Sequence, residues 1–318
     1  MALLVTGGTG FIGSYITHYA AKMRPDEQII VVDRYPVAER VAGLANVKIL
    51  DTDIGQVPEM IDVMQKNGVD RVIHMAFAIG GVKPERILQY VQTQAIGSVG
   101  VFEAARIAGV KRVIAASSVA VYGGRASATP LDEDDPVTPR DAYGATKAWM
   151  ENIANLYVDM HGMEIAHLRI SASLGSGRLG RASLNAGLTS ERLNWMASPE
   201  WAADGKPVTL PPRDQIVDVI YAVDTAAAFY AAAYAPKLGH RIYNLTGEHI
   251  TAGEFGDALR RALPDAEITH EAATSRIGPS MSNERVRADL GFKPQYTLDA
   301  AIAEYIQMTR DLRAQTPA

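Results

Sequence analysis

Thr6-Gly7-Gly8-Thr9-Gly10-Phe11-Ile12-Gly13 lies between a short apolar run, Ala2-Leu3-Leu4-Val5, and a stretch with helical periodicity from Tyr15 to Met23. This order predicts a strand, a tight glycine turn and a helix. The helix start would face the turn with unpaired N–H groups and its positive dipole end, which suits a pyrophosphate. Glycines let the backbone turn sharply and approach phosphates closely. The predicted binding residues are Gly7, Gly10, Phe11, Ile12 and Gly13, although a glycine turn alone is weak support for a ligand.

Length and composition indicate an ordinary globular protein. The 318 residues suit one large or two modest domains, with 47% hydrophobic and 21% charged residues. A net charge of −5 gives no general attraction to nucleic acid or an anionic membrane. The run Asp132-Glu133-Asp134-Asp135 is predicted to be a solvated loop.

Several site types and locations are disfavoured. Because the chain has no cysteine, it cannot form disulfides or thiolate metal sites, and a reducing compartment is favoured. The seven histidines are scattered without metal-ligand spacing. No apolar run reaches the roughly 18–20 residues that span a bilayer. We therefore expect a cytoplasmic protein with no metal and no membrane partner.

Short apolar runs alternate with helical stretches through the first half of the chain. The runs lie at 2–5, 29–32, 47–50, 71–76, 112–116 and 164–169, and helices are expected near 58–66, 84–108 and 142–160. This pattern predicts an α/β fold, a doubly wound parallel-sheet (Rossmann) domain. We expect that domain to comprise residues 1–172 and about 214–246. A smaller C-terminal substrate-binding lobe would comprise about 173–213 and 247–318, ending in a helix over 298–312.

Acidic and small residues follow the predicted second, third and fourth strands. Asp33 closes the second strand, where a carboxylate can bind both hydroxyls of an adenosine ribose and repel a 2′-phosphate. It favours NAD over NADP, although Arg34 beside it could serve a 2′-phosphate. Asp53 either meets the adenine or caps a loop, and Ile54 follows it. Ala76 and Ala78 leave room for a flat cofactor or simply pack at a strand end.

A second group of polar residues points to proton-transfer chemistry. Tyr143 and Lys147 are four residues apart, so they share one helix face. A lysine ammonium and an oxidised nicotinamide would together lower the tyrosine pKa, which is near 10 in a free phenol. Ser117 and Ser118 follow the fifth strand, where ligands bind in open parallel sheets. Taken singly, Tyr143 and Lys147 are better explained as surface residues, and the two serines as a helix cap or turn.

Together the motifs identify a resemblance to the extended short-chain dehydrogenase/reductases, in particular the NAD-dependent epimerase/dehydratase group. The matching pieces are Thr6–Gly13, Asp33, His74-Met75-Ala76, Ser117–Gly123, Pro139 with Tyr143–Lys147, and Leu168-Arg169. The resemblance implies NAD as cofactor, Tyr143 as general acid/base and Ser118 as the residue that orients the substrate. It implies that Lys147 binds the nicotinamide ribose and lowers the tyrosine pKa. It also implies a homodimer whose four-helix interface uses 84–108 and 142–160.

Three departures from the family pattern narrow the reaction. Val119 and Ala120 stand where dehydratases and decarboxylases of the family carry acidic residues, which disfavours elimination of water. Ala172 replaces an asparagine, and Val217 an arginine, that help to hold a nucleotide-sugar pyrophosphate. The candidate substrate contacts are Ser117, Ser118, Ile79, Arg178 and Arg213.

The chemistry implied is hydride transfer at a secondary alcohol or ketone carbon of a sugar, a sugar nucleotide or another hydroxy compound. An epimerase is the first hypothesis. The alternatives are a net NAD(P)-dependent dehydrogenase of a non-nucleotide substrate and, further from the motifs, a non-catalytic NAD(H)-sensing protein.

Overall fold

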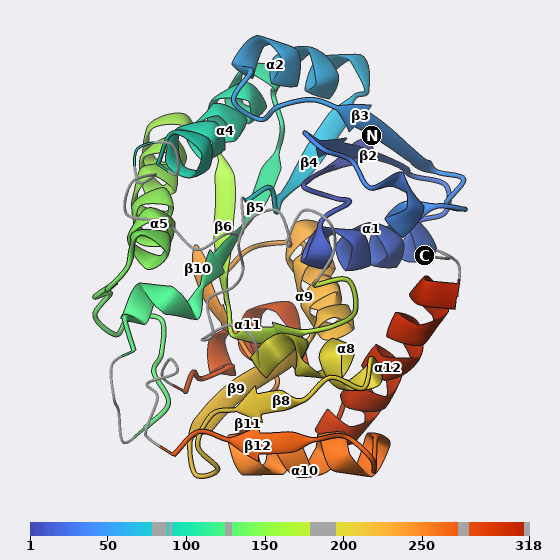
Figure 1. The fold of residues 1–318 in the computed structure, drawn as a ribbon. Coiled ribbons are helices and arrows are strands. Elements are labelled where there is room, and N and C mark those ends of the chain that lie inside the picture. The colour runs from blue at the N-terminus through green and yellow to red at the C-terminus, as the bar shows by residue number, and fades with distance from the viewer. Residues whose placement is uncertain (78–87, 89–90, 125–128, 179–194, 273–279, 315–318) are drawn as a thin grey trace.

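The computed structural model describes residues 1–77, 88, 91–124, 129–178, 195–272 and 280–314. Its centre is a seven-stranded parallel sheet in the order β10-β6-β5-β4-β1-β2-β3 (Figure 1). The order reverses between β1 and β4, because β2 and β3 extend to one side and β5, β6 and β10 to the other. Such a reversal opens a crevice at the carboxyl ends of the strands. The strands are β1 (Ala2–Thr6), β2 (Gln28–Asp33), β3 (Val47–Asp51), β4 (Val69–His74), β5 (Arg112–Ser118), β6 (Glu164–Ile170) and β10 (Ile242–Leu245).

The strands bury both faces, as the continuous apolar runs predict. Alternate residues of one strand point to opposite sides of the sheet. Leu3 and Val5 therefore join one hydrophobic core, and Ala2 and Leu4 join the other. The first core lies under α1 (Phe11–Met23) and α9 (Ala222–Tyr234), and the second under α2 (Val57–Lys66), α4 (Gly97–Ala108) and α5 (Ala142–His161). The predicted Rossmann-type fold is confirmed.

Short helical turns link these layers. They are η1 (Ala38–Val41), η4 (Val119–Tyr122), η5 (Trp195–Ala197) and the π-helical turn η3 (Gln92–Ile96). Turn η3 runs directly into α4, so the described part of the helix expected at 84–108 is helical from 91 onward. Within the described residues no helix is both long and apolar enough to span a bilayer.

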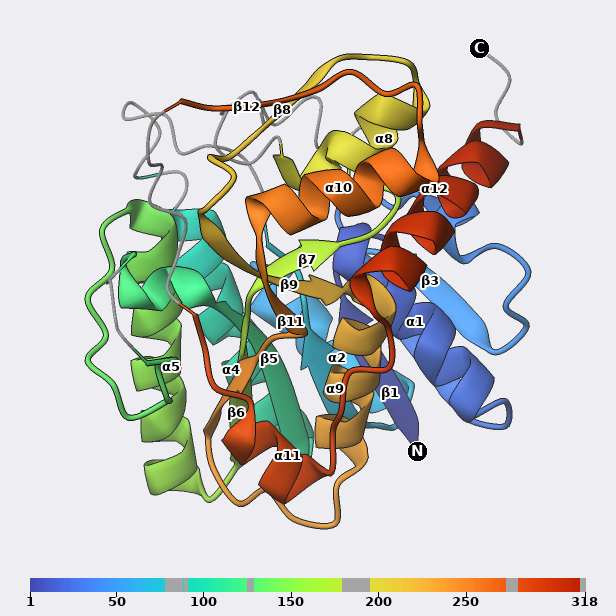
Figure 2. The ribbon, with the colours of Figure 1, turned by 90° about the horizontal axis from the view of Figure 1, so that it is seen from below.

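A smaller lobe lies beyond the carboxyl edge of the large sheet (Figures 1 and 2). One small sheet has the order β11-β9-β7, and β12 pairs with β8. Trp195, Phe255, Tyr305 and neighbouring side chains form a third hydrophobic core there. The elements are β7 (Ala172–Leu174), β8 (Val208–Leu210), β9 (Ile216–Tyr221), β11 (Glu248–Thr251), β12 (Ile268–His270), α8 (Ser198–Ala203), α10 (Ala252–Ala262) and α12 (Leu298–Ala314).

Two segments lie elsewhere than the expected domain boundaries put them. Strand β9 pairs with β7 and β11 instead of joining the large sheet. Helix α11 (Glu284–Leu290) follows the lobe residues in sequence, yet Val286 and Phe292 pack into the core under α1 and α9. Both placements follow from long-range burial, which local periodicity does not encode. We retain the two-part division as a proposal, with β9 assigned to the smaller lobe and α11 to the Rossmann domain.

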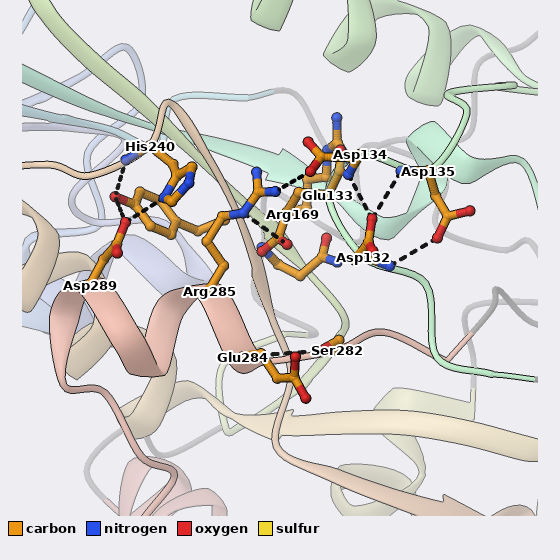
Figure 3. A network of polar contacts seen from close by, with 12 residues as sticks. Asp132, Glu133, Asp134, Asp135, Arg169, His240, Ser282, Glu284, Arg285 and Asp289 are labelled. Carbon is orange, nitrogen blue, oxygen red and sulfur yellow. Dashed lines mark hydrogen bonds and ion pairs between the residues drawn. The ribbon is translucent and has the colours of Figure 1, made fainter.

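The acidic run at 132–135 is a loop with Asp132 and Asp134 exposed, as predicted, but Glu133 is a correction to the solvated side chains expected there. Glu133 is buried; it accepts a hydrogen bond from the Asn244 backbone N–H at 2.6 Å and pairs with Arg285 at 3.3 Å. Arg285 also pairs with Asp134, as Figure 3 shows. Burial raises the pKa of Glu133, while these partners lower it. Both partners are more than 100 residues away in sequence, so the run alone gave no sign of them.

Candidate active site

The glycine turn after β1 has no room for side chains. Gly7 has a φ of +66°, and a Cβ there would lie 2.8 Å from the backbone of Ala76. A Cβ on Gly13 would overlap the Gly7 carbonyl oxygen, and one on Gly10 would lie 3.0 Å from the same oxygen. The Gly10 N–H donates to that carbonyl at 2.9 Å. The three glycines therefore hold one compact turn against the end of β4.

Helix α1 begins at this turn with its N-terminus open. Gly10 is its N-cap residue, and no side chain accepts a hydrogen bond from the first turn. The free N–H groups belong to the segment that contains Phe11, Ile12 and Gly13, which the sequence predicts as a phosphate site. A cradle that a Cβ would fill, facing an uncapped helix, fits the pyrophosphate of a dinucleotide.

Asp33 lies across from the turn at the end of β2. One carboxylate oxygen accepts hydrogen bonds from the Thr9 hydroxyl at 2.6 Å and the Thr9 N–H at 3.3 Å. Arg40, which the sequence analysis missed, donates to the Thr9 carbonyl at 3.3 Å and to the Gly177 carbonyl at 2.7 Å. It connects the glycine turn to the start of the segment after β7, and no motif in the sequence marks it.

The other residues expected at the adenosine end differ in their partners and in their exposure. Arg34 pairs with Asp53 at 3.2 Å, and both side chains are partly exposed. Asp53 also accepts a hydrogen bond from the Gly55 N–H at 2.9 Å, so it stabilises a turn. Ile54 is buried, and Ala76 lies against Gly7. Ala78 and Ile79 lie outside the described residues.

A chain of buried hydrogen bonds supports the strand ends beneath the turn. The Ala76 N–H donates to Thr6 Oγ1 at 3.2 Å, and Thr6 Oγ1 lies 2.7 Å from His74 Nδ1. His74 Nε2 lies 2.9 Å from Ser98 Oγ, which donates to the Gln94 carbonyl. Because the Ser98 proton is used there, we assign the imidazole proton to Nε2 and the Thr6 proton to the bond with Nδ1. Burial lowers the pKa of His74 to about 3, which agrees with a neutral ring.

Ser118, Tyr143 and Lys147 meet at the carboxyl end of β5. Ser118 ends that strand and caps η4, where its Oγ accepts a hydrogen bond from the Ala120 N–H at 3.2 Å. The Ser118 side chain also interacts with the Tyr143 phenol and acts to lower its pKa. Lys147 Nζ lies 5.9 Å from the centre of the Tyr143 ring and donates to the Ala116 carbonyl at 2.8 Å. The Phe77 ring, which the sequence analysis missed, lies 3.6 Å from this ammonium.

The electrostatics of Tyr143 are dominated by its burial, and the lowering of its pKa by Lys147 together with an oxidised nicotinamide stays a prediction. Burial raises the pKa of Tyr143, and the opposing contributions come from the Ser118 side chain and the charge of Arg178. Burial also lowers the pKa of Lys147 to about 7, while the charge of Glu151 raises it. The Lys147 ammonium contacts a backbone carbonyl and an aromatic ring. The net effect of the chain's own residues therefore does not favour the phenolate form of Tyr143.

Besides Ser118 in the site and Ile79 outside the described residues, three candidate substrate residues remain: one lies inside the site, one beneath it and one on the surface. The Arg178 guanidinium lies 4.7 Å from the centre of the Phe11 ring and donates to the Ser173 carbonyl at 2.6 Å. Its Nε is buried and has no hydrogen-bond partner among the described residues, so it can still receive an acceptor. Ser117 is buried and donates to Glu151. Arg213 pairs with Asp257 on the exposed side of the lobe, away from the other site residues.

Comparisons with known proteins agree with this geometry. Residues 3–246 match the model of the "NAD dependent epimerase/dehydratase family". The chain is 33% identical to a UDP-glucose 4-epimerase of Azospirillum brasilense, over 98% of this chain and 92% of that protein. It is 27% identical to a D-erythronate dehydrogenase of Cupriavidus necator, over 96% and 98%. A UDP-glucose 4-epimerase of Thermus thermophilus, solved with NAD, superposes with a TM-score of 0.81 at 25% identity, over 98% and 99%.

Proposed function

The chain belongs to the NAD-dependent epimerase/dehydratase family, and from this premise we propose that it is an NAD-dependent oxidoreductase that acts at a secondary alcohol or ketone carbon. The observation that carries the proposal is the meeting of Ser118 and Tyr143 beside Lys147. These groups lie at the carboxyl edge of the sheet, where the reversal of strand order opens a crevice. An epimerase reaction through transient oxidation is the first candidate.

The described residues fit NAD. The open start of α1 and the glycine cradle would hold the pyrophosphate, and Asp33 would bind the adenosine ribose. When bound, NAD supplies a nicotinamide ring that accepts and returns a hydride. Its positive charge in the oxidised form would lower the pKa of Tyr143, opposing the effect of burial.

Each side chain of the site then has one task. Tyr143 takes the hydroxyl proton as the alcohol is oxidised and returns it in the reverse direction. Ser118 donates a hydrogen bond to the same substrate oxygen, and Lys147 would bind the nicotinamide ribose. Arg178, with its unpartnered Nε, would contact an anionic group of the bound molecules.

One observation favours a second candidate, a net dehydrogenase of a non-nucleotide substrate. The position expected to hold the clamping arginine, Val217, is buried in the core of the lobe, and Arg213 pairs with Asp257 instead. A nucleotide-sugar pyrophosphate would therefore lack that contact, and one relative is a dehydrogenase of a hydroxy acid. A dehydratase is disfavoured for either substrate class, because Val119 and Ala120 provide no acid beside Ser118.

The two candidates are separated by incubating the purified protein with NAD and a panel of UDP-sugars, free sugars and hydroxy acids. A net dehydrogenase produces NADH, which absorbs at 340 nm, whereas an epimerase converts the sugar with no net change in absorbance. Product analysis by NMR accompanies each assay. The proposal is wrong if no compound with a secondary alcohol or ketone is converted by either measure.

The cofactor preference is expected to depend on the charge of Asp33. Asp33→Asn should weaken NAD binding by about tenfold, the value of one charge-assisted hydrogen bond. The same change should strengthen NADP binding, because a carboxylate no longer repels the 2′-phosphate. Titration calorimetry with both nucleotides measures this ratio. Asp51→Asn, at the exposed end of the neighbouring strand β3, is the control; an unchanged ratio in Asp33→Asn would contradict the assignment.

We further propose a homodimer through α4 and α5. These helices lie side by side, and apolar side chains remain exposed on them and on the preceding turn. Trp149, Leu156 and Met160 follow one another at helical spacing on α5, with Leu156 52% exposed. Such a patch is typical of an interface, and a second copy brings the same face to it. The exposed residues are Leu88, Val91, Ile96, Ile107, Trp149, Leu156 and Met160.

Light scattering after gel filtration tests this interface. The parent protein is expected at twice its chain mass of 34.3 kDa, and Leu156→Glu should shift it to the monomer. Ile216→Glu, an equally exposed position on β9, should leave the dimer intact. A parent protein that elutes as a monomer would refute the proposal.

A further inference from the structure

A buried carboxylate lies directly beneath the candidate active site. Glu151 is on α5, one turn after Lys147, and both side chains are buried. Its Oε1 accepts a hydrogen bond from the Ser117 hydroxyl at 2.5 Å. Arg169 of β6 donates to both of its oxygens, at 3.0 and 2.8 Å. The acid thus contacts both a strand that ends in the site and the next strand of the sheet.

These bonds connect one face of α5 to three successive residues of β5. Tyr143, Lys147 and Glu151 are spaced by four, so they share that face. The Tyr143 phenol interacts with the Ser118 side chain, Lys147 donates to the Ala116 carbonyl, and Glu151 accepts from Ser117. Because Ser117 lies between the other two strand residues, its anchoring fixes the strand end that aligns both of them.

The charges around Lys147 give Glu151 a second role. Its carboxylate lies near two buried cations, Lys147 and Arg169. Among the described residues, His74 of β4 and His167 of β6 also interact electrostatically with Lys147, and burial lowers their pKa values to about 3 and 4. These imidazoles are therefore neutral near pH 7 and supply no charge. A buried ammonium without a nearby anion would lose its proton readily.

We propose that Glu151 is a positioning residue of the active site, which anchors the end of β5 through Ser117 and supplies the negative charge that favours the ammonium form of Lys147. The inference rests on the proposed function, in which Lys147 and Ser118 serve Tyr143. It adds to the site a residue that no motif assigned, and a negative charge on which the protonation of Lys147 depends.

The rest of the network keeps Arg169 in place independently of Glu151. The Arg169 guanidinium also donates to the Tyr122 hydroxyl at 2.7 Å and to the Glu133 carbonyl at 3.2 Å. Glu133 is in turn held by Arg285 (Figure 3). The carbonyl of a glutamine at 151 can still accept one hydrogen bond from Arg169 or Ser117. Glu151→Gln is therefore a test that removes charge with little change of shape.

The test is a pH titration of Lys147 by NMR on protein with carbon-13-labelled lysine. The chain has nine lysines, and Lys147→Arg identifies the Lys147 signal by its loss. In Glu151→Gln the ammonium fraction at pH 7 should fall about threefold or more, because the pKa of Lys147 drops without the neighbouring anion. Glu151→Asp keeps the charge and should restore most of that fraction. Ser117→Ala should leave the titration nearly unchanged, since it removes a hydrogen bond and no charge.

Two results would overturn the inference. One is a folded Glu151→Gln protein whose Lys147 titrates as in the parent. The other applies if that variant does not fold. The parent protein is then labelled at the glutamate carboxyl carbons, and a Glu151 chemical shift that does not change at the pH where Lys147 titrates contradicts an interaction between the two charges. Because the titration needs no substrate, it is independent of the turnover assay. An expected titration with no turnover on any compound would refute the proposed function alone.

Discussion

Replacing Tyr143 with phenylalanine is expected to lower kcat/KM by about 10²- to 10⁴-fold, the usual contribution of a general acid/base. The substrate for this assay is the compound that the absorbance or NMR screen identifies. The change removes one oxygen and with it the interaction of the phenol with Ser118. The ring and its edge-on contact with Phe77, at 5.1 Å between centroids, remain. Folding and NAD affinity should therefore stay close to those of the parent.

The pH dependence gives this prediction a second measurement. Oxidation needs the phenolate, and burial raises the pKa of Tyr143, so the parent rate should increase with pH through the neutral and alkaline range. The residual rate of Tyr143→Phe should lack this increase. Tyr157→Phe is the matched control: Tyr157 is on the same helix, but its ring packs against Phe102 away from the site. Undiminished activity in Tyr143→Phe would remove the catalytic assignment and favour another use of the fold, such as NAD sensing.

The second large effect is expected from Gly13→Ala. The added Cβ would overlap the Gly7 carbonyl oxygen, which accepts the hydrogen bond from the Gly10 N–H. Neither atom can move without opening the turn or shifting the start of α1. Overpacking of this kind costs about 3 kcal/mol at the upper end of its usual range, which corresponds to about 10²-fold in NAD affinity if the strain falls on the cradle.

Calorimetric titration with NAD measures a loss of NAD affinity, and a thermal unfolding curve measures a loss of stability. The cost of the added methyl group can appear in either quantity. Gly97→Ala, at the start of α4, is the control, because its Cβ would meet only the flexible end of Ile54 at 3.1 Å. A Gly13→Ala protein with parental NAD affinity and parental stability would show that the turn is looser than its geometry indicates.

Local signals in the sequence were enough for the sheet and the glycine turn. Continuous apolar runs with helices between them require strands buried on both faces, so the parallel sheet follows from burial alone. The turn is equally local, because the overlap of a Gly13 Cβ with Gly7 arises within seven residues. The spacing of Tyr143 and Lys147 placed both on one helical face for the same reason.

What the sequence by itself determined is therefore the fold class, the glycine turn and the grouping of the three residues proposed for the reaction. Only the tertiary structure decided which charges act on them. Glu133 and Arg285, or Glu151 and Ser117, are far apart along the chain, and they pair because burial leaves each charge or hydroxyl few other partners. Burial also raises the pKa of Tyr143, while the Ser118 side chain and the charge of Arg178 act to lower it. Periodicity records which residues are buried, but the partners available inside are set by the packing of distant segments.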